Sequence, residues 1–326
     1  MRFRSRWLLL VLGLAVSVVA ALGATPVILD TDIGTDIDDT WALAQVLRSP
    51  ELDLKLVLVE TGDTRYRAAV AAKLLAAAGR SGVPIALGVA SPSDPADENQ
   101  AAWVKGYDLK QYRGRVLEDG AAAVVELVMH SPDPVTIISI GAVPALAKAV
   151  QREPRIAAHA RWIGMHGSFD VGYDGAPEAA AEANVKVDPA ALRVVLAAHW
   201  RDALITPLDT CGSVDLRGAN YHAIWDATSD PLLRSVIEGY CIFAPHQRWF
   251  NCDFFTTRSS TLFDCVAVYL AYSEQLVDVE TLHVGVTDDG FTRRDPAGPA
   301  VRVALRWKDR QAFEDQLTQR LLGHAR

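Results

Sequence analysis

Five aspartates stand within ten residues, directly after an apolar run near the amino terminus. The stretch Val27–Leu43 reads VILDTDIGTDIDDTWAL. Its carboxylates are Asp30, Asp32, Asp36, Asp38 and Asp39. Carboxylates this close together repel one another, and burial would raise their pKa values or weaken the fold. A hard cation would remove that repulsion, and Ca²⁺ accepts several oxygen ligands in flexible geometry. We therefore expect a cation site at this place in the chain.

A purely structural interpretation explains only part of this cluster. Asp36 fits the capping position of the helix that follows, and the positive amino end of that helix would stabilise Asp38 and Asp39. This leaves Asp30 and Asp32 without a role. An EF-hand loop is excluded because no glutamate stands at its twelfth position. We assign Asp36 as the cap and expect the other four carboxylates to serve a site.

A second acidic motif predicts a different chemistry. The pattern DxDx[TV] after a first strand is typical of haloacid-dehalogenase-type phosphatases, which use the first Asp as nucleophile together with Mg²⁺. Asp30 and Asp32 fit this pattern, but Gly34 occupies the Thr/Val position. The pair Asp38 and Asp39 has no role in that scheme. A metal-dependent phosphatase is therefore the alternative function.

Composition narrows the class of protein. With 326 residues, half of them hydrophobic, the chain can bury a large core as one α/β domain or two smaller ones. The net charge is −8, and no cluster of Lys and Arg stands beyond the first six residues. This argues against a nucleic-acid partner and favours a metal or a polar small-molecule substrate.

Residues 1–24 are predicted to be a signal peptide. Three arginines precede an apolar core, which ends at the small-residue sequence AALGA. The apolar run is short for a membrane span, which takes roughly 20 residues, although a retained anchor is the alternative. We expect residues 25–326 to be exported, periplasmic or secreted, as a single catalytic domain without a membrane segment after cleavage. The exported protein could form disulfides among Cys211, Cys241 and Cys252, whereas Cys265 fits a helical core position.

Short apolar runs alternate with helical stretches over the first half of the chain. Strands are predicted at 26–30, 52–60, 83–88, 135–141 and 161–167. Helices are predicted at 38–48, 64–80, 121–130 and 143–153. This alternation predicts an α/β fold with a mostly parallel central sheet flanked by helices, whose ligand site lies beyond the carboxyl ends of the strands. The last third predicts a small helical and hairpin extension, with helices within 231–250 and 260–276 and a hairpin of 279–286 and 300–307.

Four motifs resemble those of the inosine–uridine-preferring nucleoside hydrolase family. LDTDIGTDIDDTWAL resembles the family signature DTDxGxDDA with two extra residues before the final Asp pair. VTIISIGAVPALA, EANVKVDPAA and SSTLFDCVAVYLA resemble three later motifs, and all four stand in the family's order along nearly the whole mature chain. The resemblance implies a nucleoside-hydrolase-like fold and an exported enzyme that hydrolyses ribonucleosides to ribose and free base.

The resemblance also implies a site. Ca²⁺ would be held by Asp32, Asp39, Asp264 and the main-chain carbonyl of Ile140. Asp32 would take the proton of a metal-bound water, and the clustered carboxylates would stabilise an oxocarbenium-like ribose. The ribose hydroxyls would be bound by Asp38, Asp63, Glu182 and Asn184, with Asp30 orienting its neighbours. Structural alternatives stay open, because Asp264 also fits a capping box that begins at Thr261, and Glu182 and Asn184 could simply flank a helix.

One departure limits what is implied about the base. Several family members have a His before the final Asp, where it assists the leaving base, but here this position is Phe263. Candidates for the base pocket are Phe263, His166, His246, Trp249 and Trp103. The departure keeps a third function open, a nucleoside- or sugar-binding protein without turnover. The sequence does not reveal the preferred nucleobase, and the family resemblance is compatible with a homo-oligomer.

Overall fold

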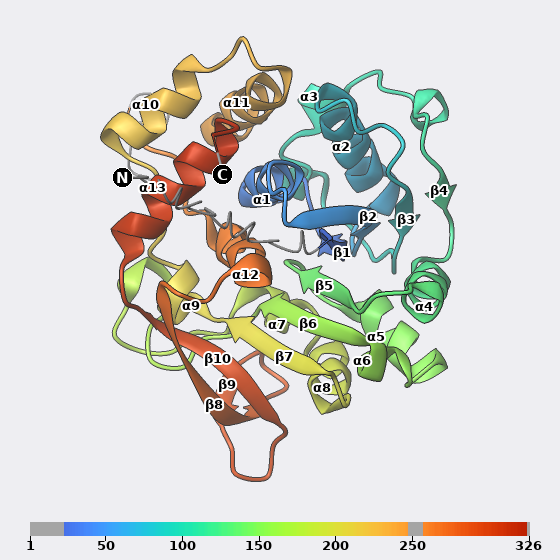
Figure 1. Ribbon diagram of the computed structural model, residues 1–326, viewed down its shortest axis with the longest axis vertical. Coiled ribbons are helices and arrows are strands. Elements are labelled where there is room, and N and C mark those ends of the chain that lie inside the picture. The colour runs from blue at the N-terminus through green and yellow to red at the C-terminus, as the bar shows by residue number, and fades with distance from the viewer. Residues whose placement is uncertain (1–22, 247–256, 325–326) are drawn as a thin grey trace, which may run out of the picture.

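The parallel sheet forms as expected, and within the described residues it contains more strands than the apolar runs of the sequence predict. A computed structural model describes residues 23–246 and 257–324. Within these residues ten strands form one sheet in the order β4-β3-β2-β1-β5-β6-β7-β10-β8-β9 (Figure 1). Pairing is parallel from β4 through to β10, and β8 and β9 are antiparallel additions at one edge. The predicted mostly parallel α/β fold is confirmed.

The strands and helices have the following bounds. The strands are β1 Thr25–Thr31, β2 Leu52–Val59, β3 Ile85–Leu87, β4 Val116–Leu117, β5 Val135–Ser139, β6 Ala160–Met165, β7 Asp202–Thr206, β8 Val277–Val286, β9 Thr292–Arg294 and β10 Ala300–Trp307. The α-helices are α1 Asp38–Leu47, α2 Thr64–Ala77, α3 Ala101–Val104, α4 Gly120–His130, α5 Pro144–Arg152, α6 Ile156–His159, α7 Ala183–Val187, α8 Pro189–Ala197, α9 Leu208–Cys211, α10 Gly218–Asp226, α11 Pro231–Phe243, α12 Phe263–Tyr272 and α13 Arg310–Leu321. Short 3-10 turns are η1 Pro95–Asp97, η2 Leu109–Gln111, η3 Tyr173–Gly175 and η4 Ala244–His246.

The central strand β1 is buried on both faces. Val27, Ile28 and Leu29 are all fully buried, and the chain alternates between two apolar clusters on opposite faces of the sheet. Val27 and Leu29 join the cluster that includes α1, α2, α11 and α12, whereas Ile28 joins the cluster of α4, α5 and α8. Full burial of such a side chain contributes about 1.5–3 kcal/mol. A strand that is buried on both faces has a continuous run of apolar residues, and this run allows the strand to be predicted from the sequence.

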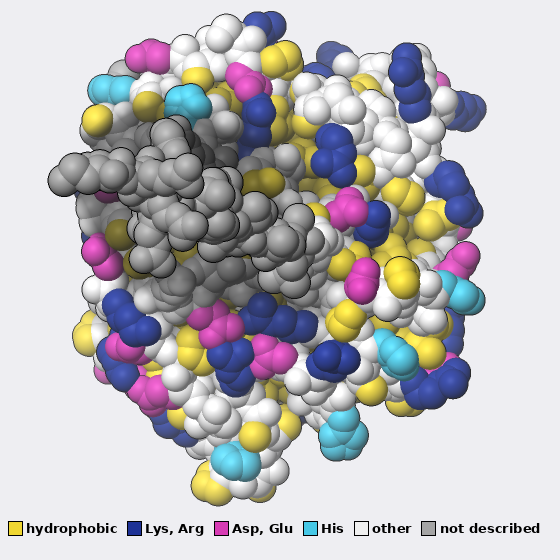
Figure 2. All heavy atoms as spheres, viewed as in Figure 1, with side chains coloured by type: hydrophobic (Ala, Val, Ile, Leu, Met, Phe, Trp, Pro, Cys, Tyr) yellow, Lys and Arg dark blue, Asp and Glu magenta, His cyan; other side chains and the backbone are white. Residues whose placement is uncertain are grey.

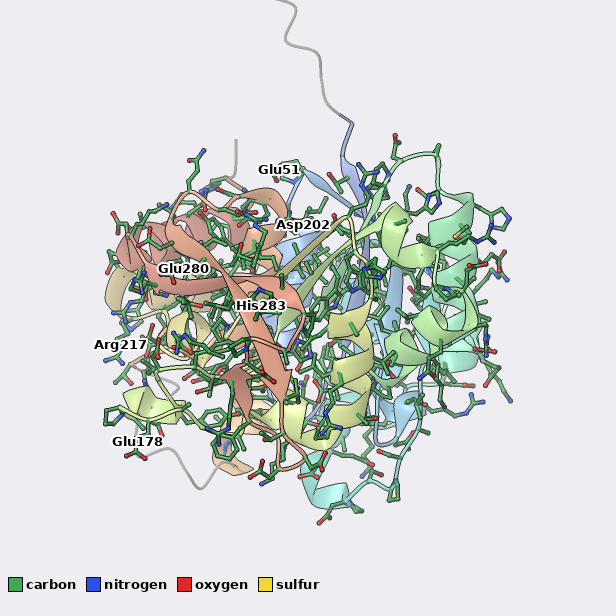
Figure 3. All side chains as sticks on the ribbon, turned by 90° about the horizontal axis from the view of Figure 1, so that it is seen from below. Glu51, Glu178, Asp202, Arg217, Glu280 and His283 are labelled. Atoms are coloured by element: carbon green, nitrogen blue, oxygen red, sulfur yellow. The ribbon has the colours of Figure 1, made fainter. Side chains whose placement is uncertain are left out.

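The predicted carboxyl-terminal hairpin forms, and it extends the main sheet at one edge. Strands β8 and β10 do pair antiparallel, but β10 also pairs in parallel with β7 through Arg302–Leu204 and Val303–Ile205. Strand β7 was not predicted, because DALIT is short and begins with a partly exposed aspartate. Figure 3 shows the labelled Glu280 and His283 on the long hairpin.

A cluster of ion pairs joins this added part to β6. Arg161 of β6 pairs with Asp202 of β7 at 2.8 Å and with Glu274 at 2.7 Å, and Arg302 of β10 pairs with the same two acids. Each such partly exposed pair contributes at most about 1 kcal/mol, but four of them share partners and fix the order of three strands. On the face shown in Figure 2, basic side chains are scattered, several of them beside acidic ones.

The predicted signal peptide lies almost entirely outside the described residues. In the described part of the chain, no helix has both the length and the apolar character that a membrane span requires. Within the same residues Cys211, Cys241 and Cys265 carry free thiols, so Cys211 and Cys241 are not bonded to each other. Cys252 lies outside the described residues. The core position predicted for Cys265 is confirmed, since this residue is fully buried in α12.

Candidate active site

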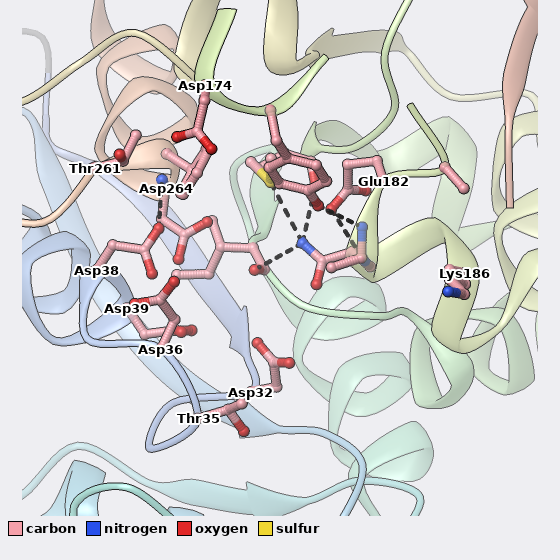
Figure 4. A pocket seen from close by; sticks show the side chains of 17 residues that line it. Asp32, Thr35, Asp36, Asp38, Asp39, Asp174, Glu182, Lys186, Thr261 and Asp264 are labelled. Atoms are coloured by element: carbon pink, nitrogen blue, oxygen red, sulfur yellow. Dashed lines mark hydrogen bonds between the residues drawn. The ribbon is translucent and has the colours of Figure 1, made fainter. Parts of the chain in front are cut away.

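A cavity of about 540 Å³ opens at the carboxyl ends of β1, β5 and β6 (Figure 4). Asp32 follows β1, Ile140 follows β5 and Met165 ends β6, and all three line this cavity. The other lining residues come from the start of α1, the segment from η3 to α7, and the start of α12. They are Thr35, Asp36, Asp38, Asp39, Tyr173, Asp174, Ala181, Glu182, Ala183, Asn184, Lys186, Thr261, Phe263 and Asp264.

Three buried carboxylates meet where two helices begin. Asp38 and Asp39 lie in the first turn of α1, and Asp264 lies in the first turn of α12, which packs against α1. One oxygen of each lies within 4.8 Å of the others, and Figure 4 shows the three side chains converging. The backbone N–H of Asp264 donates to Asp38 Oδ2 (3.3 Å), and the hydroxyl of Thr31 donates to Asp39 Oδ1. Both helix dipoles are positive at this point and favour negative charge.

The two helix dipoles do not neutralise the negative charge of these three carboxylates. Burial raises the pKa of Asp38, Asp39 and Asp264 well above the ordinary range, and repulsion between neighbouring carboxylates raises it further. Among the described residues no Lys or Arg forms an ion pair with any of the three. Convergent, uncompensated carboxylate oxygens form the donor set of a hard cation. The residues present therefore fit a divalent metal ion.

Asp32 points into the same cavity but lies apart from the trio (Figure 4). Its backbone is held by Arg67, a buried residue of α2 that donates to the carbonyls of Asp32, Ile33 (3.1 Å) and Thr61 (2.9 Å). Burial raises the pKa of Asp32, and the Arg67 guanidinium opposes that rise. Sequence reasoning missed Arg67, because nothing distinguishes it from Arg65 and Lys73 in the same alanine-rich helix.

Asp30 is fully buried one layer behind this wall and does not line the cavity. Its Oδ2 accepts from the hydroxyl of Ser139 (2.7 Å), which itself accepts from Trp162 Nε1 (3.1 Å). Burial, followed by repulsion from Glu60, raises the pKa of Asp30 well above its ordinary value. Asp30 thus lies outside the cavity, and its predicted role in orienting its neighbours stays a prediction.

Glu182 and Asn184 build the opposite wall and also hold the local fold. Glu182 caps α7 and accepts from the backbone N–H of Gly167 (3.1 Å), Asn184 (2.8 Å) and Val185 (3.2 Å). Burial raises its pKa to about 7. The amide of Asn184 donates to the carbonyls of Ile140 (3.2 Å) and Met165 (3.2 Å). Ile140 lines the cavity and its carbonyl accepts the hydrogen bond from Asn184, while its predicted role as a metal ligand stays a prediction.

Two predicted helix caps do not form. Helix α1 has Ile37 at its N-cap without a side-chain hydrogen bond, while Asp36 bonds only the adjacent N–H of Ile37 (2.6 Å) and lines the cavity. Helix α12 likewise has Leu262 at its N-cap without a side-chain bond, so Thr261 and Asp264 form no capping box. Asp36, which lies within the two-residue insertion, therefore lines the cavity and does not cap α1. Burial raises the pKa of Asp36 to about 6.

Several predicted site residues lie elsewhere. Asp63 is exposed and caps α2 by accepting from Arg65 N (2.9 Å) and Tyr66 N (3.1 Å), so it does not line the cavity. His166 is buried behind Gly141, and Trp103 packs on α11 through Glu238 (3.2 Å). Neither Asp63 nor His166 lines the cavity, so we do not place either residue at the substrate. The side chain of His246 and the whole of Trp249 lie outside the described residues.

Comparison with known proteins identifies the family. The family model described as inosine-uridine preferring nucleoside hydrolase matches residues 27–315. The chain belongs to this family. It is 31% identical over 176 residues to a non-specific ribonucleoside hydrolase, RihC, from Salmonella newport, which covers 52% of this chain and 56% of the relative. RihC of Escherichia fergusonii is 28% identical over 219 residues, covering 61% and 71% respectively. The chain thus spans about half the length of the Salmonella relatives it matches.

Solved structures of nucleoside hydrolases share the fold. A plant nucleoside hydrolase, the PpNRh1 enzyme, superimposes with a TM-score of 0.74 at 24% identity, covering 91% of this chain and 98% of the plant chain. An inosine-uridine preferring nucleoside hydrolase from Bacillus anthracis superimposes with a TM-score of 0.69 at 17% identity, covering 92% and 99%. At these identities the likeness establishes the fold alone.

Two rim residues of this nucleoside hydrolase family member were missed from sequence. Tyr173 and Asp174 lie in η3 and line the cavity, and Asp174 has a positive φ of 56°. The Tyr173 hydroxyl accepts from the N–H of Ala183 (2.8 Å), and its ring meets Phe263 edge-on, with centroids 6.1 Å apart. Nothing in the local sequence GYDGAPE marks these side chains as site residues. Their position depends on a tertiary contact, in which Tyr173 packs against Phe263 at the start of α12.

We predict that Asp63→Ala lowers the free energy of unfolding by about 1 kcal/mol, because it removes an N-cap. Urea denaturation measures this change. Nucleoside affinity should stay as in the unmodified protein, since Asp63 does not line the cavity. Weaker nucleoside binding with unchanged stability would restore the sugar-binding role predicted from sequence.

We predict that Gly141→Ala disturbs Asp32. A Cβ at position 141 would lie 2.8 Å from Asp32 N and 2.8 Å from Asp32 Oδ1, closer than real contacts allow. We expect a loss of about 1–3 kcal/mol in the free energy of unfolding, as for other overpacked sites. Gly82→Ala is the matched control, because a Cβ there meets nothing within 4 Å. Equal stability of the two variants would show that Asp32 does not pack on Gly141.

We predict that His166 makes stability depend on pH below neutrality. Its Nε2–H donates to the Gly141 carbonyl (3.1 Å), its Nδ1 has no partner among the described residues, and burial lowers its pKa to about 4. The unfolded chain binds this proton near pH 6.5 and the folded chain does not, so stability is full above 6.5 and falls as pH drops toward 4.

The contribution of His166 to the free energy of unfolding should fall by about 2 kcal/mol between pH 7.5 and pH 5. Urea denaturation of the unmodified protein and of His166→Gln at both values measures the difference, and the variant should lose that share of the pH dependence. His283→Gln, which changes an exposed histidine of the hairpin, is the control (Figure 3). A pH dependence that is identical in His166→Gln and the unmodified protein would show that His166 is not buried in its neutral form.

Proposed function

We propose that the protein hydrolyses the N-glycosidic bond of ribonucleosides, releasing ribose and the free base. Membership of the nucleoside hydrolase family supports this, and one observation carries it. A single cavity brings together a buried carboxylate trio, a separate carboxylate at Asp32, and two side chains that can hydrogen-bond sugar hydroxyls, Glu182 and Asn184. Each of these parts has a place in cleavage through an oxocarbenium-like transition state.

We propose Ca²⁺ as the resident metal, because the donors are carboxylate and carbonyl oxygens in flexible number. Asp39 and Asp264 would hold it, as the family resemblance implies, and Asp38 of the same trio would bind a ribose hydroxyl. Asp32 and the Ile140 carbonyl complete the predicted set from the neighbouring strand ends. When bound, such an ion supplies Lewis acidity toward a water molecule and toward vicinal hydroxyl groups.

The protein's own residues would then divide the work. Asp32 accepts the proton of the attacking water, and burial, which raises its pKa, brings it nearer to the working pH of a general base. Glu182 and Asn184 are preorganised by the hydrogen bonds described above, so their remaining capacity can orient ribose hydroxyls without reorganisation. The carboxylates of the trio stabilise positive charge that develops on the sugar.

We also propose that the mature protein is exported. The leader at residues 1–24 supports this through its basic start, apolar core and small-residue cleavage region.

The test is release of reducing sugar. We expect the purified protein with Ca²⁺ to release ribose from inosine and uridine, and exhaustive chelation to abolish this until Ca²⁺ is restored. Asp32→Asn should lower kcat by about 10²–10⁴-fold, the usual worth of a general base. Asp63→Asn is the matched control, since it makes the same change at a carboxylate outside the cavity and should keep full activity.

Three outcomes would contradict the proposal. Release of phosphate from a phosphomonoester without release of ribose would favour the phosphatase interpretation. Binding of nucleosides without turnover would favour a binding protein. Activity that survives exhaustive metal removal would exclude the Ca²⁺ assignment while leaving hydrolysis in place.

A further inference from the structure

Two carboxylates of the cavity have no role in the proposed function. Asp36 and Asp174 both line it, one from the loop before α1 and one from η3. Asp174 makes no hydrogen bond or ion pair with the rest of the described chain, and it holds a positive φ of 56° that non-glycine residues seldom adopt. Figure 4 shows it above the trio, with its carboxylate turned toward the cavity.

The charge of this cavity exceeds what one divalent ion offsets. Among the described lining residues seven are carboxylates and a single lysine is basic. The carboxylates are Asp32, Asp36, Asp38, Asp39, Asp174, Glu182 and Asp264. The lysine, Lys186, lies beyond Glu182 and away from the trio in Figure 4. With a divalent cation in place, the carboxylates of the cavity still outnumber its positive charges, so a net negative field remains within it.

An aromatic wall faces the same space. Phe263 and Tyr173 meet edge-on at an interplanar angle of 77°, and both line the cavity. Aromatic faces attract a cationic ring by roughly 0.5–2 kcal/mol, more when the cation is desolvated. Two aromatic rings beside uncompensated carboxylates form the combination that recognises a delocalised organic cation.

We propose that the preferred substrates are ribosides whose base already carries a fixed positive charge, such as N-ribosylated pyridinium compounds. This proposal rests on the proposed function and specifies its substrate class. Asp36 and Asp174 supply the attraction, and Phe263 and Tyr173 supply the surface against which the charged ring packs.

The chemistry of such a substrate suits the residues present. When the C1′–N bond breaks, its electron pair moves to the ring nitrogen and cancels the positive charge, so the base departs neutral without receiving a proton. Water adds to C1′ and loses its proton to Asp32, from which it passes to solvent. One proton is therefore released per turnover. Phe263, which cannot donate a proton, is then no handicap at the position it occupies.

The experiment compares 1-(β-D-ribofuranosyl)nicotinamide, a cation, with inosine, which is neutral. We expect the full-length protein with Ca²⁺ to hydrolyse the cation with the higher kcat/KM, and to release one proton per ribose in a pH-stat. Raising the salt concentration should lower kcat/KM for the cation more than for inosine, because screening weakens the attraction.

A variant series separates this from the greater intrinsic reactivity of the cation. Asp174→Asn should lower kcat/KM for the cation about three- to tenfold, the worth of one partly screened charge at short range. It should leave inosine within about twofold, and the ratio of the two effects is independent of intrinsic reactivity. Glu178→Gln removes a charge of the same sign from an exposed site four residues away that does not line the cavity, and should change neither substrate.

The outcomes are distinguishable. Hydrolysis of inosine with equal or greater kcat/KM than the cation, or equal effects of Asp174→Asn on both, overturns the substrate class and leaves the proposed function standing. Failure to hydrolyse either substrate overturns both. Unchanged thermal unfolding of Asp174→Asn confirms that its effect is on the substrate, which is expected because Asn tolerates the same positive φ.

Discussion

Mutual repulsion among buried carboxylates is the constraint around which this site is organised. Helices α1 and α12 begin against each other, and the first turns of both place acidic side chains in the same small volume. Two helix dipoles, a threonine hydroxyl and one main-chain N–H offset part of that repulsion. None of them carries a full positive charge. Burying a carboxylate without an opposite charge costs free energy of folding. The folded chain therefore gains stability from any cation that binds there, by the general linkage between binding and folding.

The scaffold concentrates this charge because a parallel sheet brings strand ends to one edge. Asp32 lies at that edge with its backbone clamped by a buried arginine of α2 and its side chain packed on Gly141. Glu182 and Asn184 are tied to the strand ends of β5 and β6 by their own hydrogen bonds. Because interiors are close-packed, such contacts leave the site little freedom to relax. The geometry of the site is thus a property of the sheet and its packed helices as a whole.

Much of this could be predicted from sequence, and the failures have physical causes. Continuous apolar runs revealed β1, β2, β5 and β6, since strands buried on both faces need such runs. Strand β7 was missed because it is short and has a polar start, and the place of β10 beside it depends on partners about a hundred residues apart. The resemblance to a family supplied the link between Asp39 and Asp264, which no local pattern contains. Asp63 shows the limit most clearly, because a carboxylate after a strand serves equally well as a ligand or as the cap of the next helix.

The departures from the family pattern become coherent once they are placed in one cavity. Asp36, within the two-residue insertion before Asp38, lines the cavity and does not cap α1. The loop at η3 adds a second carboxylate at Asp174, and Phe263 replaces a proton donor by a ring that packs on Tyr173. For a neutral nucleoside the missing acid would weaken cleavage, and the added carboxylates would give its uncharged base no extra attraction. Taken together, they let the cavity attract a base that already carries a positive charge. Such a base leaves as a neutral molecule, so its departure requires no acid.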